Sequence, residues 1–199
     1  MEQTTSLPEA RAALVRERVL EGVATVLATG DDLTFAKVAK AAQVPERTIY
    51  RHFPTREALL TAVFEWANRR MGFEGELPTD GAGVVDLVRR VFPGFDELAP
   101  VIRELLIAPE GLLARLSNQA DRQQAALAVV AAEAPDLDPA RARRVAAAVQ
   151  LLTTAAAWQT LRDYWDMDGE EAAETAALAV ELLLDGARRP DPQPLTPGS

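Results

Sequence analysis

The polar residues between Glu46 and His52 have the types and spacing needed to contact a DNA duplex. At helical spacing, Ile49 and Phe53 face inward and the remaining side chains face outward. Arginine can bind guanine through two hydrogen bonds, threonine can reach base edges, and tyrosine and histidine can donate to phosphate oxygens. This pattern predicts a helix that reads DNA. The candidate DNA-binding residues, two of which lie outside this helix, are Thr34, Glu46, Arg47, Thr48, Tyr50, Arg51, His52 and Arg56.

Two further helices are expected to position this reading helix. Residues 35–42 carry apolar side chains at helical spacing, and the Thr34 hydroxyl can accept a backbone N–H at the start of that helix. The chain breaks at residues 43–45, because proline restricts the residue before it and is favoured at the first position of a helix. A third apolar stripe then runs over residues 55–70 and leads away from the reading helix.

These three segments resemble the helix-turn-helix of the tetracycline-repressor (TetR) family. The resemblance is carried by Ala-Gln-Val at 42–44, Thr-Ile-Tyr-Arg-His-Phe at 48–53 and Thr-Arg-Glu-Ala-Leu-Leu at 55–60. In detail it covers residues 10–67, about a third of the chain. It implies an all-α protein with an N-terminal DNA-binding head and a C-terminal helical domain that dimerises and binds a small effector. The alternative is a helical hairpin in another all-α protein.

Two residues depart from the family's pattern. Gln43 stands where the family often has glycine, so a left-handed backbone at this position would be strained. Pro45 stands where the family often has serine, which removes a hydroxyl that could contact phosphate. Both departures bear on which bases are read, and neither changes the expected fold.

The net charge of −9 over 199 residues is unusual for a DNA-binding protein, so its distribution along the chain matters. The segment from Thr34 to Arg56 carries a charge of +4, whereas the residues from 71 onward carry −10. Phosphate contacts depend on local charge, and an acidic remainder repels DNA from the other surfaces. The overall charge is therefore compatible with a basic reading head.

The composition disfavours an enzyme, a metal site and a membrane protein. The chain has no cysteine and His52 is its single histidine, so no metal site or histidine-based catalytic triad can be assembled. We expect no metal, no cofactor and no catalytic residue. The most apolar runs are shorter than the ~20 residues of a membrane-spanning helix, and Met1–Leu7 is too polar for a signal sequence. A cytoplasmic protein without membrane contact is the expectation.

We predict three segments along the chain. A helix-turn-helix domain covers residues 8–70, an effector-binding and dimerisation domain covers 71–187, and a disordered tail covers 188–199. A glycine-rich loop over residues 72–83 follows the first domain. Beyond it, apolar spacing predicts helices over 84–92, 95–107 and 110–133, broken by Pro93-Gly94, Pro109 and Pro135.

Two late segments predict a homodimer. Residues 145–158 are rich in alanine, and the final helix has a narrow acidic stripe on an otherwise apolar surface. A helix that is apolar over most of its circumference must be covered on two sides, and a second copy can cover the side that the domain's own core does not. The last two long helices would then form half of a symmetric four-helix interface. A fully intramolecular core is the alternative.

Aromatic and polar side chains of the C-terminal domain can line a mainly apolar cavity. Trp158 and Trp165 are seven residues apart, a spacing that is also typical of an ordinary helical core. The family resemblance implies a small effector without saying which residues touch it. The candidate effector-binding residues are Phe92, Phe95, Gln150, Thr154, Trp158 and Trp165.

Our hypothesis is a sequence-specific transcriptional regulator. The complete hypothesis is that the protein is a repressor. It binds an inverted-repeat operator in double-stranded DNA and is released by a small, largely apolar effector. One alternative is an effector-independent DNA-binding or protein-interaction module, for which a filled C-terminal core would be the discriminating sign. The other is an all-α enzyme, which a second titratable cluster in a pocket would favour.

Overall fold

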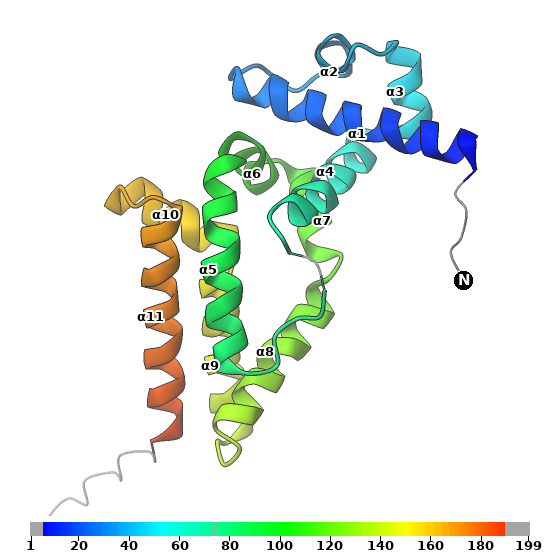
Figure 1. The fold of residues 1–199 in the computed structure, drawn as a ribbon. Coiled ribbons are helices and arrows are strands. Elements are labelled where there is room, and N and C mark those ends of the chain that lie inside the picture. The colour runs from blue at the N-terminus through cyan, green and yellow to red at the C-terminus, as the bar shows by residue number, and fades with distance from the viewer. Residues whose placement is uncertain (1–5, 74, 190–199) are drawn as a thin grey trace, which may run out of the picture. The chain divides into compact units, whose positions relative to one another are not determined.

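The fold, shown in Figure 1, is that of a computed structural model that describes residues 6–73 and 75–189. The described residues form eleven α-helices and no strand, which confirms the predicted all-α class. None of these helices is both long enough and apolar enough to cross a membrane. The chain divides into two compact units, which we call the head unit (Met1–Glu74 and Gly94–Asn118) and the second unit (Gly75–Pro93 and Gln119–Ser199). The domain boundary that we placed after residue 70 remains a prediction.

The head unit begins with a long helix that supports two short ones. These helices are α1 (Leu7–Ala28), α2 (Phe35–Ala42) and α3 (Glu46–His52). The unit continues with α4 (Arg56–Arg70), α6 (Ala99–Ile107) and α7 (Pro109–Leu116). Their starts follow from local chemistry, because the hydroxyls of Thr34 and Thr55 accept backbone N–H bonds in the first turns of α2 and α4. Fully buried apolar residues from four helices form the core, among them Val19, Val23, Val38, Ile49, Leu60 and Val63.

The turn between α2 and α3 has a left-handed backbone at Gln43, the conformation that we noted would be strained there. Gln43 has φ 53° and ψ 42°, a conformation that costs a non-glycine residue about 1–2 kcal/mol. Arg18 of α1 donates a hydrogen bond of 2.8 Å to the carbonyl of Ala42 and so satisfies the end of α2. A Cβ added at Gly22 would lie 2.9 Å from the Cβ of Ala42, so α1 and α2 are in close contact here. The strained turn is thus held from α1.

Replacing Gln43 with glycine is expected to stabilise the protein. Glycine adopts a positive φ without a Cβ clash, and part of this gain is offset by its greater freedom in the unfolded chain. We expect the Gln43→Gly variant to gain about 1 kcal/mol in the free energy of unfolding, measured by urea denaturation. Gln123→Gly, within α8 (Gln119–Glu133), is the matched control and should lose about 1 kcal/mol. Equal losses in both variants would contradict the assigned strain.

The second unit contains α5 (Gly81–Glu97), whose last residues belong to the head unit, and four later helices. These are α8, α9 (Pro139–Leu152), α10 (Ala155–Trp165) and α11 (Gly169–Arg188). The core consists of small and β-branched side chains from α5, α8, α9 and α11, which allows the helices to pack closely. It comprises Val84, Val85, Ala126, Val129, Val130, Ala146, Val149, Ala177, Val180 and Leu184.

Three helix boundaries in the C-terminal half differ from those predicted. The break expected at Pro93-Gly94 is absent, because α5 continues through Pro93 to Glu97. Phe92 and Phe95 on either side are both buried, and this packing outweighs the hydrogen bond that proline cannot make. The segment predicted as one helix over 95–107 therefore becomes the end of α5 followed by α6.

The other two differences are breaks within predicted helices. The segment over 110–133 divides near Ser117 into α7 and α8. The apolar run over 145–158 divides at Thr153 and Thr154 into α9 and α10. The Thr154 hydroxyl accepts the N–H of Ala157, so it caps the new helix. The two threonines gave a local signal for this break that the apolar pattern masked.

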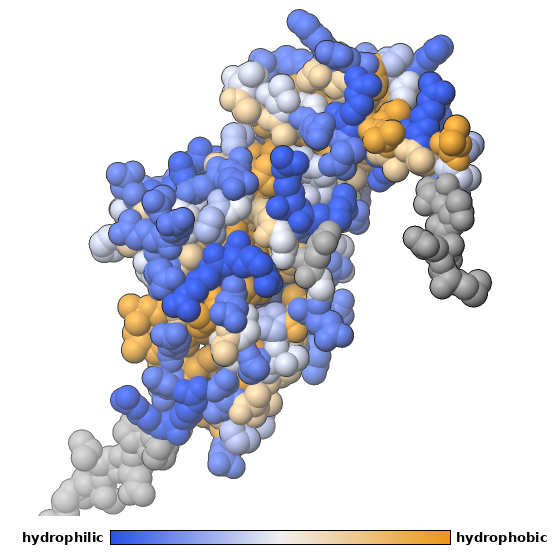
Figure 2. Space-filling view, viewed as in Figure 1, coloured by the Kyte–Doolittle hydropathy of each residue, from blue (hydrophilic) through white to orange (hydrophobic). Residues whose placement is uncertain are grey.

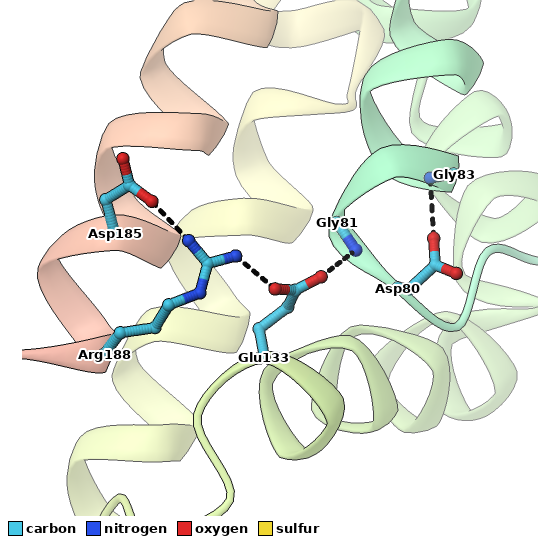
Figure 3. A network of polar contacts seen from close by, with 6 residues as sticks. All are labelled: Asp80, Gly81, Gly83, Glu133, Asp185 and Arg188. Atoms are coloured by element: carbon cyan, nitrogen blue, oxygen red, sulfur yellow. Dashed lines mark hydrogen bonds and ion pairs between the residues drawn. The ribbon is translucent and has the colours of Figure 1, made fainter.

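Glu133, the last residue of α8, joins the ends of three helices (Figure 3). Its carboxylate accepts the N–H of Gly81 at 2.8 Å and pairs with Arg188, which also pairs with Asp185. The hydrogen bond from Arg188 and then that from Gly81 lower the pKa of Glu133 below its ordinary value. The tail predicted over 188–199 included Arg188, but Arg188 is the last residue of α11. Residues 190–199 lie outside the described residues.

Replacing the carboxylate of Glu133 with a neutral amide is expected to lower the free energy of unfolding at neutral pH. A carboxyl whose pKa is lower in the folded than in the unfolded state stabilises the fold above its unfolded pKa, about 4.3 for glutamate. That contribution is lost as the pH falls through the lower, folded pKa. We expect Glu133→Gln to lose about 1 kcal/mol at pH 7 and to converge with the wild type once the pH falls below the folded pKa of Glu133, measured by urea denaturation. Glu76→Gln is the control, and a pH-independent loss in Glu133→Gln would contradict the charge argument.

Candidate nucleic-acid interface

Helix α3 presents a polar face to solvent and an apolar face to the head unit. Ile49 is fully buried and Phe53, just after the helix, is 1% exposed, as the sequence pattern predicted. Thr48 and His52 are half-buried. The exposed residues of α3 are Glu46, Arg47, Tyr50 and Arg51. This arrangement makes the face available to a duplex, and contact of these side chains with DNA remains a prediction.

Tyr50 is held in place by Phe35, an aromatic residue of the apolar segment that the sequence predicted over residues 35–42. Its ring stacks on that of Phe35 with centroids 4.5 Å apart and planes 9° apart. The Tyr50 residue remains 48% exposed, so the stack fixes the ring while solvent reaches the residue. Phe35 is thus a supporting residue of the candidate interface. Fifteen residues separate the two rings along the chain, and no local pattern pairs them.

His52 is less available than the sequence suggested. Its Nε2 atom is buried and has no hydrogen-bond partner among the described residues. Burial, followed by the nearby charges of Arg51 and Arg16, lowers the pKa of His52 below its ordinary value. The imidazole is therefore neutral at pH 7 and could donate to a phosphate only through Nδ1.

Among the described residues of the head unit, some cations are held in ion pairs, and others are exposed without an ion-pair partner. Lys37 forms an exposed ion pair with Asp31 at 3.0 Å. Within residues 34–56, which are all described, Lys40, Arg47 and Arg51 are exposed and have no ion-pair partner. These three cations are the ones available to a DNA duplex. Lys40 was counted in the charge of the head but was not among the candidate binding residues.

The two candidates outside α3 both have roles within the head unit. The Thr34 oxygen accepts the N–H of Lys37 at 3.3 Å, which leaves the hydroxyl proton free for a phosphate oxygen. Arg56 instead donates to the carbonyl of Leu33 at 2.8 Å and pairs with Glu104 of α6. The sequence gave no indication of this second partner.

The candidate effector residues do not share one environment. Phe92 and Trp158 are fully buried, whereas Trp165 at the end of α10 is 70% exposed. Gln150 and Thr154 are half-buried, and Phe95 is buried within the part of α5 that belongs to the head unit. The seven-residue spacing of the two tryptophans therefore does not place both in one core. No three side chains of a metal-binding type come together in the described part of the chain.

Comparison with known proteins finds a family match for part of the head unit. Residues 30–63, from the end of α1 into α4, match the family described as "Bacterial regulatory proteins, tetR family". The fold is similar to that of NalD, described as the secondary repressor of the MexAB-OprM multidrug efflux pump in Pseudomonas aeruginosa. That likeness has a TM-score of 0.60 at 17% identity and covers 86% of this chain and 96% of NalD. The multidrug binding protein EbrR, complexed with imidazole, gives a TM-score of 0.49 at 20% identity, covering 84% and 93% of the two chains. No curated protein sequence matches the chain.

The family match covers residues 30–63 alone, and the likeness to NalD, at 17% identity, concerns the fold. The segment matched to the family contains the whole of α2 and α3 and most of α4, so the residues exposed on α3 lie within it.

Proposed function

We propose that this protein is a TetR-family regulator, a homodimeric repressor that binds an inverted-repeat operator and leaves it when a small, largely apolar molecule binds. The observation that carries the proposal is the polar face of α3, which is exposed above the buried residues Ile49 and Phe53. A buried apolar base with exposed arginine and tyrosine suits a helix that enters a major groove.

Helix α11 supports the proposed dimer. Its inner face is buried in the second unit, but Leu178 and Leu182, one turn apart, are 57% and 62% exposed. Figure 2 shows hydrophobic surface gathered over this helix. Exposed apolar groups of this size commonly mark an interaction surface. A second copy could cover these leucines, and a dimer whose two reading helices enter successive major grooves needs them about 34–36 Å apart.

The second unit supports an apolar effector. Phe92 and Trp158 are fully buried among helices whose core is built of alanine, valine and leucine. A ligand that enters among these helices would contact apolar groups on most of its surface. If it fits better when the head has left the operator, it shifts the population toward the free state.

The experiment that tests release is a titration of candidate apolar compounds against the protein with and without operator DNA. Tryptophan fluorescence reports binding, because Trp158 is buried in the second unit. We expect a releasing compound to bind more weakly to the operator complex, by the factor that corresponds to about 1–3 kcal/mol of coupling. A compound that binds with identical affinity in both titrations does not release DNA, and this would refute the coupling.

The complete burial of Phe92 and Trp158 also favours the second candidate, a DNA-binding regulator without an effector. The same titration separates the two candidates. Operator binding by a protein whose fluorescence and affinity respond to none of the compounds would support the effector-independent regulator.

A further inference from the structure

Arg56, the first residue of α4, is tied to three other segments of the head unit. Its Nη1 donates to the carbonyl of Leu33 at 2.8 Å, and its Nη2 pairs with the carboxylate of Glu104 on α6. Its Nε lies 3.7 Å from a carboxylate oxygen of Glu110 on α7. All the nitrogens of the planar guanidinium thus face acceptors, an arrangement that lysine could not reproduce.

The partners of Arg56 are themselves partly buried. The side chain of Glu104 is 16% exposed and that of Glu110 is 30% exposed, compared with 36% for Arg56. Leu33, whose carbonyl accepts the bond from Arg56, immediately precedes Thr34, the residue that caps α2. The guanidinium therefore fixes the chain where it enters the helix-turn-helix.

We propose that Arg56 is a positioning residue for DNA binding and not a phosphate contact. It holds the start of α2 and the start of α4 against α6 and α7, and so sets the orientation in which α3 is presented. The inference rests on the head's binding of DNA and is independent of the proposed effector. It also differs from the expectation drawn from sequence, in which Arg56 would bind phosphate.

Removing Glu104 separates the two roles, because they predict opposite signs. If Arg56 binds phosphate, the Glu104→Ala variant frees its charge and removes an anion, so operator binding tightens. If Arg56 positions α2 and α4, the same variant leaves the guanidinium without its main partner and operator binding weakens. We expect a weakening of about tenfold, the equivalent of about 1.4 kcal/mol. Glu97→Ala is the matched control, since Glu97 is an exposed acid of the same unit.

The salt dependence of binding gives a second readout that a positioning role does not change. Each phosphate contact contributes about 0.9 to the slope of log K against log salt concentration. We expect Arg56→Ala to weaken operator binding and to leave the slope unchanged. Arg51→Ala, which removes an exposed cation of α3, should lower the slope by about 1.8 in a dimer with two heads. The double variant Arg56→Ala/Glu104→Ala should bind more tightly than the product of the single losses predicts.

Hydrogen exchange tests the positioning role of Arg56 without DNA. It therefore distinguishes a failure of this role from a protein that binds no operator. Amide exchange in α2 and α3 should be faster in Glu104→Ala than in the wild type and unchanged in Glu97→Ala. Tighter or unchanged operator binding by Glu104→Ala, a lower salt slope in Arg56→Ala, or unchanged exchange in α2 and α3 would each overturn the positioning role. A wild type that binds no duplex would overturn the proposed function instead, and exchange would still decide the role of Arg56.

Discussion

The affinity of this protein for its operator is expected to fall about a hundredfold between 50 and 200 mM monovalent salt. Lys40 and Arg51 are exposed and have no ion-pair partner within residues 34–56, and Arg47, which shares these properties, is expected to contact base edges instead. Two heads of a dimer would therefore bring about four cations to the phosphates. Neutralising about four phosphates gives a slope of about −3.6 in a plot of log K against log salt concentration, which corresponds to this loss.

Fluorescence anisotropy with a labelled duplex at several salt concentrations measures the slope. Lys37→Ala is the useful control, because Lys37 is already paired with Asp31 and its removal should change the slope less than removal of Lys40. An affinity that is independent of salt would show that the exposed cations do not meet phosphate.

Arg47→Ala is expected to produce the largest loss of sequence preference. Arg47 is exposed in the first turn of α3, the part of a reading helix that contacts base edges. An arginine that binds a base through two hydrogen bonds contributes about 1–3 kcal/mol of discrimination. In a dimer this contact occurs twice, so the loss of operator affinity should exceed that from any other single substitution in α3.

Tyr50→Phe provides the contrast with Arg47→Ala. The stack on Phe35 retains the ring, so this variant removes the hydroxyl alone. A phosphate contact carries no base information, and we therefore expect weaker binding to all sequences in equal proportion. Competition between operator and mutated duplexes measures both effects. A loss of preference in Tyr50→Phe comparable with that in Arg47→Ala would contradict the assigned roles.

The parts of the fold that were predictable from sequence depend on neighbours along the chain. The start of α2 was anticipated because Thr34 can bond a backbone group three residues away, and the start of α4 followed from the apolar stripe that begins at residue 55. The turn at Gln43 was placed by the family resemblance, which often has glycine there, and its backbone is left-handed. Local chemistry of this kind leaves a pattern in the sequence.

The parts that were not predictable depend on partners far along the chain. Arg56 finds Glu104 forty-eight residues later, so its charge was assigned to DNA. The uninterrupted helix through Pro93 reflects burial of Phe92 and Phe95 by tertiary packing, which outweighs the local signal of proline. The candidate effector residues share apolar character, but α10 begins at a threonine cap and carries Trp165 to an exposed end.

Selection of binding sites from a pool of random duplexes, by the wild type and by Arg47→Ala in parallel, tests the central claim that α3 reads DNA sequence. For the wild type we predict an enriched inverted repeat with half-site centres about 34–36 Å apart. For Arg47→Ala we predict the same repeat with the preference lost at one position of each half-site. A wild type that enriches no sequence, or a variant with an unchanged profile, would contradict the claim.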